Sequence, residues 1–504
     1  MSMSSKLCAQ VALAAFVAAG IAEHAPCQKA PDTELATARD KYGSDKEGDC
    51  TAATEICVKK NNVAAVELML ETLRLGADRR DFLPSGHYRD IVWGGLARIT
   101  DPYARQRVEM ELKTNRESAW VRQWCAELLG EYGVNEFGET LLKALGDKDI
   151  DVQRAATRAL GKVRFGAAAK TLLARIGDKD MYLREYAIES LARIDPAVHK
   201  PLFVKSLKDR DGGVRCALLG AAGEIYPSEA EGWSVAALDD KDWRPRMQAV
   251  DNLGGIKTKS AVDALIKALG DGRPAVGARA LHRLQELTGQ KHTRKEVWEA
   301  WWKDHRESFE FPDGASKADL AADGTTVAYH GIQLVSDHVA FLIDKSDDMN
   351  QNLAATKSSK AEAAFKELDS VLAKLQGRLV FNIYTYAEDV AVFEDKGPVE
   401  LTAKTKEKAL RFVELAPIGK SKNIWKLLET VIVDPELDTA YMLSSGEPDI
   451  GEYVHWNRVT WHLKELNRFQ KVVVHTIAYS NSEWYRDQLS KIAEVTGGEF
   501  KWSE

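Results

Sequence analysis

A 31-residue repeat constrains this 504-residue chain more than any other feature. Its clearest mark is a column of aspartates that recur every 31 residues: Asp147, Asp178, Asp209, Asp240 and Asp271. In the first four copies a second carboxylate follows two positions later, at Asp149, Asp180, Asp211 and Asp242. A fixed period near 30 residues, with apolar positions at helical spacing, is typical of stacked helical hairpins. The sequence therefore predicts an all-α solenoid.

Three further columns give each repeat an apolar helix face, because their members stand four positions apart. They are Val121, Val152, Leu183, Val214, Pro245 and Val276, then Cys125, Ala156, Ala187, Leu218, Ala249 and Ala280, then Leu129, Leu160, Leu191, Ala222, Leu253 and Leu284. The first aspartate of each repeat is expected in the turn before a helix, where it accepts from free amide hydrogens.

A basic column follows the same period, with members at Arg122, Gln153, Arg184, Arg215, Arg246 and Gly277. We expect its arginines to pair with the aspartate column of the neighbouring repeat, as a structural ladder. A ligand-binding groove is the alternative interpretation of the same charges.

The repeats resemble the short HEAT repeats that also occur in phycobilisome lyases. This resemblance implies a superhelical solenoid, which we place at residues 62–306. A tryptophan-rich segment closes it, with Trp298, Trp301 and Trp302 on one side of a helix. We expect these rings to cap the last repeat, although a carbohydrate or peptide platform is the other possibility.

The first residues are typical of an export signal. Lys6 precedes an apolar run from Leu7 to Ala19, and small residues follow at a cleavage spacing. We predict a signal peptide at residues 1–22, with an uncleaved anchor as the alternative, and a polar flexible leader at residues 23–61. The mature chain is then exported, to a periplasmic, cell-surface or secreted location, and contains no further segment apolar enough to span a membrane.

Charge and cysteine content narrow the partners and the chemistry. The net charge of −7 gives no reason to expect nucleic acid as a partner. Cys50 and Cys57 lie in a polar region and could form a disulfide after export, which the sequence leaves open. Cys125 and Cys216 fall at core positions of predicted helices and are expected to be buried thiols.

After a predicted linker at residues 307–324, strands alternate with helices from residue 325 to residue 504. This pattern predicts an α/β domain with a doubly wound, mainly parallel, Rossmann-like sheet. The expected strands are 327–330, 333–336, 338–344, 379–386, 391–393, 439–444, 472–479 and 499–502, and the expected helices are 357–375, 404–415, 423–433, 454–469 and 482–495. On the fourth helix, we expect Trp456 and Trp461 to face the sheet.

The most informative stretch of this domain runs from Val339 to Met349. Five apolar residues predict a strand buried on both faces, and it ends in the oxygen-bearing side chains of Asp344, Ser346 and Asp348. Oxygen groups at the carboxyl end of a parallel strand are placed to converge on one small cation.

This stretch, the strand order and the closing segment resemble the von Willebrand factor A domain. The resemblance implies a metal-ion-dependent adhesion site, built from an Asp-x-Ser-x-Ser loop, a threonine loop and an Asp of a third loop. The matching positions for a metal are Asp344, Ser346, Asp348, Ser421 and Ser445, and the implied cation is Mg²⁺, Mn²⁺ or Ca²⁺.

Two of these positions depart from the family pattern, because Asp348 replaces a serine and Ser445 replaces the third-loop aspartate. A degenerate site without metal is therefore the competing interpretation, with Lys345 and Lys420 expected to neutralise the acidic cluster. No cofactor is required under that interpretation.

Both halves resemble families that bind other proteins. We therefore expect an exported, non-enzymatic adhesion or scaffold protein, with a helical array for extended contacts and an A domain for localised ligand capture. The alternatives are an enzyme-associated protein related to bilin lyases, and a mechanical envelope protein with an inactive metal site. The sequence does not identify the protein partners.

Overall fold

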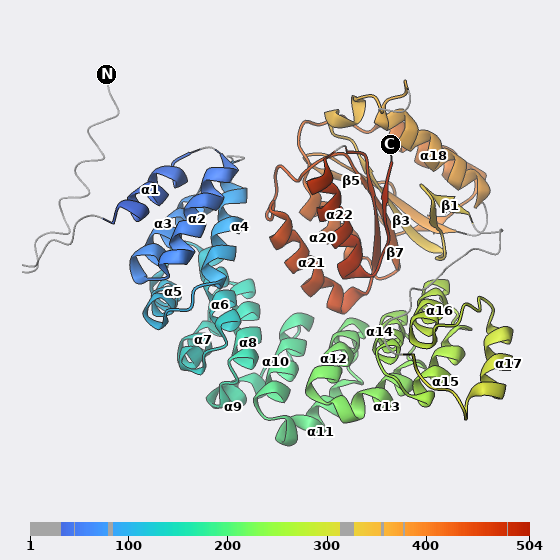
Figure 1. Ribbon diagram of the computed structural model, residues 1–504, viewed down its shortest axis with the longest axis horizontal. Coiled ribbons are helices and arrows are strands. Elements are labelled where there is room, and N and C mark those ends of the chain that lie inside the picture. The colour runs from blue at the N-terminus through green and yellow to red at the C-terminus, as the bar shows by residue number, and fades with distance from the viewer. Residues whose placement is uncertain are drawn as a thin grey trace, which may run out of the picture.

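The computed structural model describes residues 32–44, 46–78, 84–312, 327–353, 357–375, 379–480 and 482–503. An arc of helices forms the N-terminal part, and an α/β domain lies inside that arc (Figure 1). The predicted signal peptide and residues 313–324 of the predicted linker lie outside the described residues. Within the described ranges, no helix combines the length and apolar content that crossing a membrane requires.

The predicted solenoid is an array of helices that bend into an arc, as Figure 1 shows. Its helices are α1 (Thr33–Tyr42), α2 (Glu47–Lys60), α3 (Val63–Asp78), α4 (Pro84–Ala97), α5 (Pro102–Thr114), α6 (Ala119–Tyr132), α7 (Gly138–Ala144), α8 (Ile150–Lys162), α9 (Ala169–Leu173), α10 (Met181–Ile194), α11 (Pro196–Ser206), α12 (Gly212–Ile225), α13 (Pro227–Ala237), α14 (Trp243–Gly254), α15 (Lys259–Ala268), α16 (Pro274–Thr288) and α17 (Lys295–His305). Helices α6, α8, α10, α12, α14 and α16 carry the three apolar columns, pack side by side and line the inner side of the arc.

The arginine ladder forms as predicted, between residues 25 positions apart. Its ion pairs are Arg122–Asp147 at 2.7 Å, Arg184–Asp209 at 3.2 Å, Arg215–Asp240 at 2.6 Å and Arg246–Asp271 at 2.7 Å. Gln153 takes the place of an arginine in the column, and its side-chain amide donates to the Asp147 backbone carbonyl over 2.8 Å. Because each arginine joins two successive repeats, the ladder fixes their spacing.

Helix capping belongs to the second carboxylate column, which corrects the sequence interpretation. Asp149 and Asp180 are N-cap residues whose side chains accept from amides of the helix that follows. The first column instead accepts from the amide of the second, as Asp147 does from Asp149 over 3.0 Å. The first aspartate thereby holds the turn, and both of its oxygens accept from the ladder arginine, as in Asp147 with Arg122.

The prediction of a flexible leader at residues 23–61 is wrong for most of its length. Helices α1 and α2 occupy residues 33–42 and 47–60, and α2 packs against α3 and α4. The apolar residues that α2 buries are small ones, Cys50, Ala53 and Cys57, which produce little hydrophobic periodicity in the sequence. These helices extend the solenoid toward the N-terminus.

The helices also decide whether the cysteines can form a disulfide. Cys50 and Cys57 are both buried on α2, and seven residues of helix separate their Cα atoms by about 10.5 Å. A disulfide needs Cα atoms within about 7 Å, so these two cannot pair while α2 is intact. Cys125 and Cys216 are buried thiols, as predicted.

The tryptophan-rich helix α17 caps the last repeat, as expected. Trp298 and Trp302 are buried in the same apolar cluster as residues of α14, α15 and α16. The Trp302 indole donates to Asp263 over 2.6 Å, which fixes α17 on α15. Phe309 and Phe311 then pack over this cluster, so the first residues of the predicted linker are part of the cap.

The C-terminal part is a mainly parallel sheet with helices on both faces. Its strands are β1 (Ala328–Tyr329), β2 (Ile332–Gln333), β3 (His338–Asp344), β4 (Val380–Tyr386), β5 (Val390–Val392), β6 (Val399–Glu400), β7 (Thr439–Ser444), β8 (Val473–Ala478) and β9 (Phe500–Trp502), and its helices are α18 (Lys360–Lys374), α19 (Ala403–Leu415), α20 (Ile424–Ile432), α21 (Trp456–Gln470) and α22 (Glu483–Thr496). The strand order is β5-β4-β3-β7-β8-β9, with β6 antiparallel to β4. β1 and β2 form a separate two-stranded sheet instead of joining the main one, and the short β6 was not predicted.

Strand β3 is buried on both faces, as its apolar run predicts. It runs parallel to β4 and β7. Phe341 and Ile343 belong to the apolar cluster under α18 and α19, whereas Ala340 and Leu342 belong to the cluster that contains α20, α21 and α22. That second cluster continues into the solenoid and includes residues of α2 to α10.

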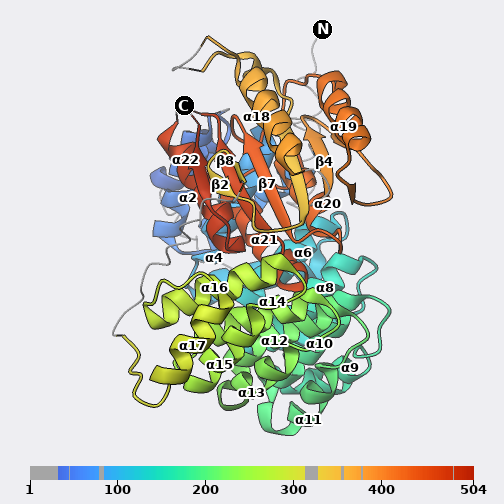
Figure 2. The same ribbon diagram turned by 90° about the vertical axis from the view of Figure 1, so that its right-hand side faces the viewer.

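The α/β domain therefore docks through one helical layer. Helix α21 faces the inner side of the solenoid, with α20 and α22 beside it, and α18 and α19 lie on the far side of the sheet (Figures 1 and 2). The carboxyl ends of the parallel strands, where Asp344 and Ser445 lie, form the edge that we call the carboxyl edge.

Candidate functional site

Three of the predicted ligand residues meet at the carboxyl edge. Asp344 ends β3 and is 1 % exposed. One of its oxygens accepts from the Ser346 amide over 2.8 Å, and the other accepts from the Ser445 amide over 2.8 Å and its hydroxyl over 2.7 Å. The hydroxyls of Ser346 and Ser445 lie 3.2 Å apart. The first and third loops are thus tied together through one buried carboxylate.

The second loop reaches the same place through its backbone. Gly419 pairs with Ser346 in a parallel bridge, and its carbonyl accepts from the Asp347 amide over 2.8 Å. The Ser421 amide donates to Glu388 over 3.2 Å. Within the part of the chain that the structure describes, no hydrogen bond joins the Ser421 hydroxyl to the other four predicted ligands.

Asp348 is held by a residue that the sequence interpretation did not single out. Its carboxylate accepts from Lys422 Nζ over 2.8 Å, and Asp449 lies 3.6 Å from the same ammonium. The Lys422 side chain is only 4 % exposed. Burial by itself would lower the pKa of Lys422, but the bond to Asp348 and the charges of Asp449 and Asp344 outweigh it and raise the pKa.

Among the described contacts, neither of the two lysines that were expected to neutralise the cluster forms an ion pair with Asp344 or Asp348. Lys345 Nζ donates to the Val413 carbonyl over 3.0 Å, at the end of α19. Lys420 is exposed, and its amide donates to Glu388 over 2.7 Å. Lys422 takes the role instead, and the sequence signal for it was weak because a lysine beside a helix start is usually solvated.

These residues do not fit a resident divalent cation. Mg²⁺ requires near-octahedral oxygen ligands. Asp344, Ser346 and Ser445 are close enough to face one ion, but the Ser421 hydroxyl is not bonded into that group and Asp348 is paired with Lys422. A buried ammonium thus stands beside the place where the resemblance implies a metal.

The second candidate surface is the interface between the solenoid and α21. The two residues before α21 are held by the solenoid, because Asp90 of α4 accepts from the Val454 amide over 3.2 Å and the His455 amide over 2.9 Å. Arg89 donates to the Glu452 carbonyl over 2.5 Å. A carboxylate at this helix end is favoured by the helix dipole.

The C-terminal half of α21 is held by ion pairs with the inner helices. Arg468 donates to Glu185 of α10 over 3.0 Å and also to Glu189. Lys471, just after α21, lies 2.7 Å from Asp251 of α14. Buried pairs of this kind fix orientation more than they add stability.

A further set of contacts lies at the amino ends of β3 and β7. Trp243 donates to the Pro435 carbonyl over 3.1 Å, and Arg273 Nε lies 2.9 Å from the buried Asp438. Asp337, His338 and Asp438 have ligand atoms close enough for a metal ion. The Arg273 guanidinium already balances Asp438, so this group is better explained as part of the interface.

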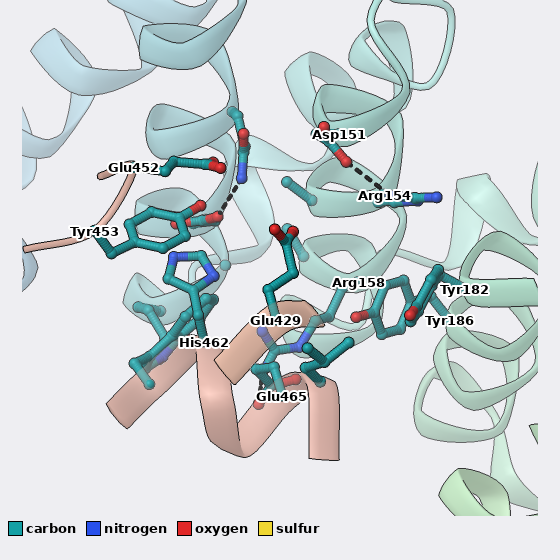
Figure 3. Close-up of a pocket in the computed structure, with 18 of the residues that line it drawn as sticks. Asp151, Arg154, Arg158, Tyr182, Tyr186, Glu429, Glu452, Tyr453, His462 and Glu465 are labelled. Carbon is teal, nitrogen blue, oxygen red and sulfur yellow. Dashed lines mark hydrogen bonds and ion pairs between the residues drawn. The ribbon is translucent and has the colours of Figure 1, made fainter. Parts of the chain in front are cut away.

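A pocket of about 370 Å³ remains between the two parts (Figure 3). Tyr453 and His462 stack at 3.7 Å on one side of it, and Tyr182 and Tyr186 line the other. Arg158 crosses the pocket to Glu465 of α21 over 2.6 Å. The pocket is a gap within the interface, and most of the charged side chains that line it form ion pairs within the chain.

Trp461 corrects another expectation. It packs on Trp93 of the solenoid at 5.9 Å and lies under the Arg158 guanidinium, rather than facing the sheet. Trp456 is buried against Tyr485 of α22, within the core of the α/β domain. Adjacent faces of α21 thus serve the domain core and the interface.

Comparison with known proteins finds one family model and one curated relative that are similar to parts of the chain. A model of HEAT repeats matches residues 109–180 and 230–308. A segment of 169 residues, 33% of this chain, is 25% identical to von Willebrand factor A domain-containing protein 3B of Homo sapiens. The chain carries HEAT repeats followed by a von Willebrand factor A-like domain. The matched segment spans only 12% of the human protein.

Two solved structures are each similar to a part of the chain. The complex of CpcE and CpcF of phycocyanin lyase from a Nostoc species has 17% identity and a TM-score of 0.28, over 57% of this chain and 100% of that chain. A von Willebrand factor type A structure from Catenulispora acidiphila has 14% identity and a TM-score of 0.28, over 34% of this chain and 40% of that chain. With scores this low, neither likeness carries an argument about function.

Proposed function

We propose that this chain is an exported, non-enzymatic protein-interaction scaffold that captures a protein ligand at the carboxyl edge of its A domain. HEAT repeats and A domains are both interaction modules, which supports a scaffold role in general. Export rests on the N-terminal sequence, and adhesion rests on the family resemblance of the A domain.

The observation that carries the proposal is the division of surfaces between the two parts. The inner side of the solenoid, a surface that could offer extended contacts to partners, is in contact with α21 of the same chain. At the carboxyl edge, by contrast, the side chains of Leu415 and Ile418 stay exposed among the residues that the structure describes. In this proposal the solenoid is a rigid support that holds the A domain in one orientation.

The carboxyl edge has the composition of a protein contact. Leu415, the last residue of α19, is 69 % exposed, and Ile418, on the loop whose Gly419 pairs with Ser346, is 59 % exposed. The Asp348 and Asp449 carboxylates of the first and third loops are each 39 % exposed. Exposed apolar side chains rimmed by charge are typical of protein-binding surfaces.

A bilin-lyase-like role is less well supported. In that role the solenoid would offer its inner surface to a chromophore or a modified protein, and here that surface holds the A domain. A mechanical envelope role does not account for the two exposed apolar residues at the carboxyl edge.

The test is ligand capture by surface variants of the full chain. Ile418→Asp and Leu415→Asp should each abolish capture of the same cross-linked protein from an extracytoplasmic fraction. Val198→Asp on α11 is the matched control, because Val198 is 65 % exposed on the solenoid. Capture that survives both edge variants but is lost with Val198→Asp would contradict the proposal.

A further inference from the structure

We propose that the Lys422 ammonium replaces the divalent cation of the A-domain site, so that the carboxyl edge of this chain is metal-independent. This inference concerns the edge used in the proposed function, but it does not depend on the identity of a partner.

The first support is that one ammonium connects all three loops of the site. Lys422 itself comes from the second loop, it donates to Asp348 of the first, and it lies beside Asp449, which follows the third. The Asp449 carboxylate also accepts from the Lys422 amide over 3.0 Å. A bound cation would hold three loops together by the same kind of contact, with oxygen ligands from each.

The second support is a glycine that makes room for the ammonium. A Cβ added at Gly446 would lie 3.0 Å from Lys422 Nζ and 3.3 Å from an Asp348 oxygen. The backbone of the third loop therefore approaches the charged pair closely. A side chain at position 446 would separate the ammonium from the loop that carries Ser445.

The third support is the hydrogen bonding of Asp344. A carboxylate has about four lone-pair positions, and three protein donors already use Asp344. Asp348 is bound to Lys422. The two carboxylates most able to attract a cation, Asp344 and Asp348, therefore already have hydrogen-bond donors within the chain. A divalent ion would also meet the repulsion of a buried positive charge.

The chemical consequence concerns how a ligand is gripped. A metal with an open position binds a carboxylate of the partner directly, whereas the ammonium of Lys422 directs its hydrogen bond to Asp348 and lies against Asp449. The edge therefore has no open coordination position for an acidic residue. Recognition then rests on Leu415, Ile418 and the surrounding charges.

The test uses Mn²⁺ as the probe, since its electron paramagnetic resonance signal reports the free ion. The full wild-type chain should leave the free Mn²⁺ signal unchanged at stoichiometric protein, and neither Mg²⁺ nor EDTA should shift its Tm. The double variant Asp348→Ser/Lys422→Thr removes the Asp348–Lys422 pair and places a hydroxyl at each of the two positions. It should gain a Tm increase of several degrees with Mg²⁺, a shift that Asp344→Asn then removes.

Lys420→Thr is the matched control, because this neighbouring lysine is exposed, and its Tm should remain insensitive to Mg²⁺. Stoichiometric Mn²⁺ binding by the wild-type chain, abolished by Asp344→Asn, would overturn the inference even if the double variant fails to fold. Such a result would leave the proposed scaffold function standing. Conversely, failure of the ligand-capture experiment would leave the metal measurement unaffected.

Discussion

Arg458 of α21 donates to Glu127 of α6 over 3.0 Å, and the two side chains are 1 % and 6 % exposed. The guanidinium also lies over the rings of Trp93 at 4.1 Å and Trp124 at 4.6 Å, both of the solenoid. A buried cation with one acidic partner and aromatic faces around it is a specific lock between segments far apart in the sequence. The two parts of the chain are thereby joined as one unit.

Removing the acidic partner should reveal this lock. Glu127→Ala leaves the Arg458 charge buried without its carboxylate, and we expect a loss of about 3–5 kcal/mol in the free energy of unfolding. Urea denaturation of the full chain measures this loss. The exposed pair Arg98–Glu55, with side chains 49 % and 56 % exposed, supplies the control, and Glu55→Ala should cost less than about 1 kcal/mol. Equal losses in the two variants would mean that the interface is solvated.

Close packing of the inner helices depends on glycine at position 161. A Cβ added to Gly161 of α8 would lie 2.7 Å from the Ser190 Cα of α10, which is backbone and cannot rotate away. Gly161→Ala should therefore lower the free energy of unfolding by roughly 1–3 kcal/mol. A Cβ added to Gly223 of α12 would meet nothing within 4 Å. Gly223→Ala should therefore raise the free energy of unfolding by about 0.5–1 kcal/mol. The opposite signs are the diagnostic result in thermal or urea unfolding.

The ladder should distinguish arginine from lysine. Arg215 donates through two nitrogens to Asp240 and through a third to the Asp209 carbonyl over 2.7 Å. The single ammonium group of lysine cannot reproduce this arrangement of three guanidinium donors, so Arg215→Lys should lower the free energy of unfolding by roughly 1–3 kcal/mol. Lys267→Ala is the control, because its pair with Asp239 is exposed, and it should change stability by less than about 0.5 kcal/mol. A ladder that tolerates lysine would have no role in fixing repeat spacing.

The interface should weaken in acid through Asp251. Burial alone would raise the pKa of Asp251, but Lys471, Arg279 and Arg283 outweigh it and hold the pKa well below its usual range. A lowered folded-state pKa contributes stability above the unfolded value of about 3.9, and this contribution is lost as the pH falls through the folded value. At pH 5 the free energy of unfolding should therefore be larger for the wild-type chain than for Asp251→Asn. This difference should become smaller below about pH 4. A gap that stays constant with pH would contradict the shift.

The solenoid could be predicted from the sequence because its information is local and periodic. The columns at Val121, Arg122 and Cys125 repeat with the helices themselves, and the pairing of arginine with aspartate follows from one repeat step. The same reasoning missed α1 and α2. Their buried residues are small, and α1 is fixed partly by ion pairs of Lys60 with Asp32 and Glu34, which no periodicity shows.

The α/β domain was predicted for similar reasons, but its docking was not. A pattern of apolar positions tells which side of α21 is buried and not what buries it, so Trp461 was assigned to the wrong neighbour. At the carboxyl edge, Asp344, Ser346 and Ser445 came together as predicted. Lys422 was missed because the partners that hold it, Asp348 and Asp449, lie 74 and 27 positions away.

The docking of the A domain inside the solenoid is tested most directly by a zero-length carbodiimide cross-link between Lys471 and Asp251. Their charged atoms lie 2.7 Å apart, although the residues belong to different domains. Mass spectrometry of the monomeric band should find the peptide that joins these two residues, alongside the exposed Lys267–Asp239 pair as a positive control. Recovery of the control link without any Lys471–Asp251 link would contradict a docked A domain.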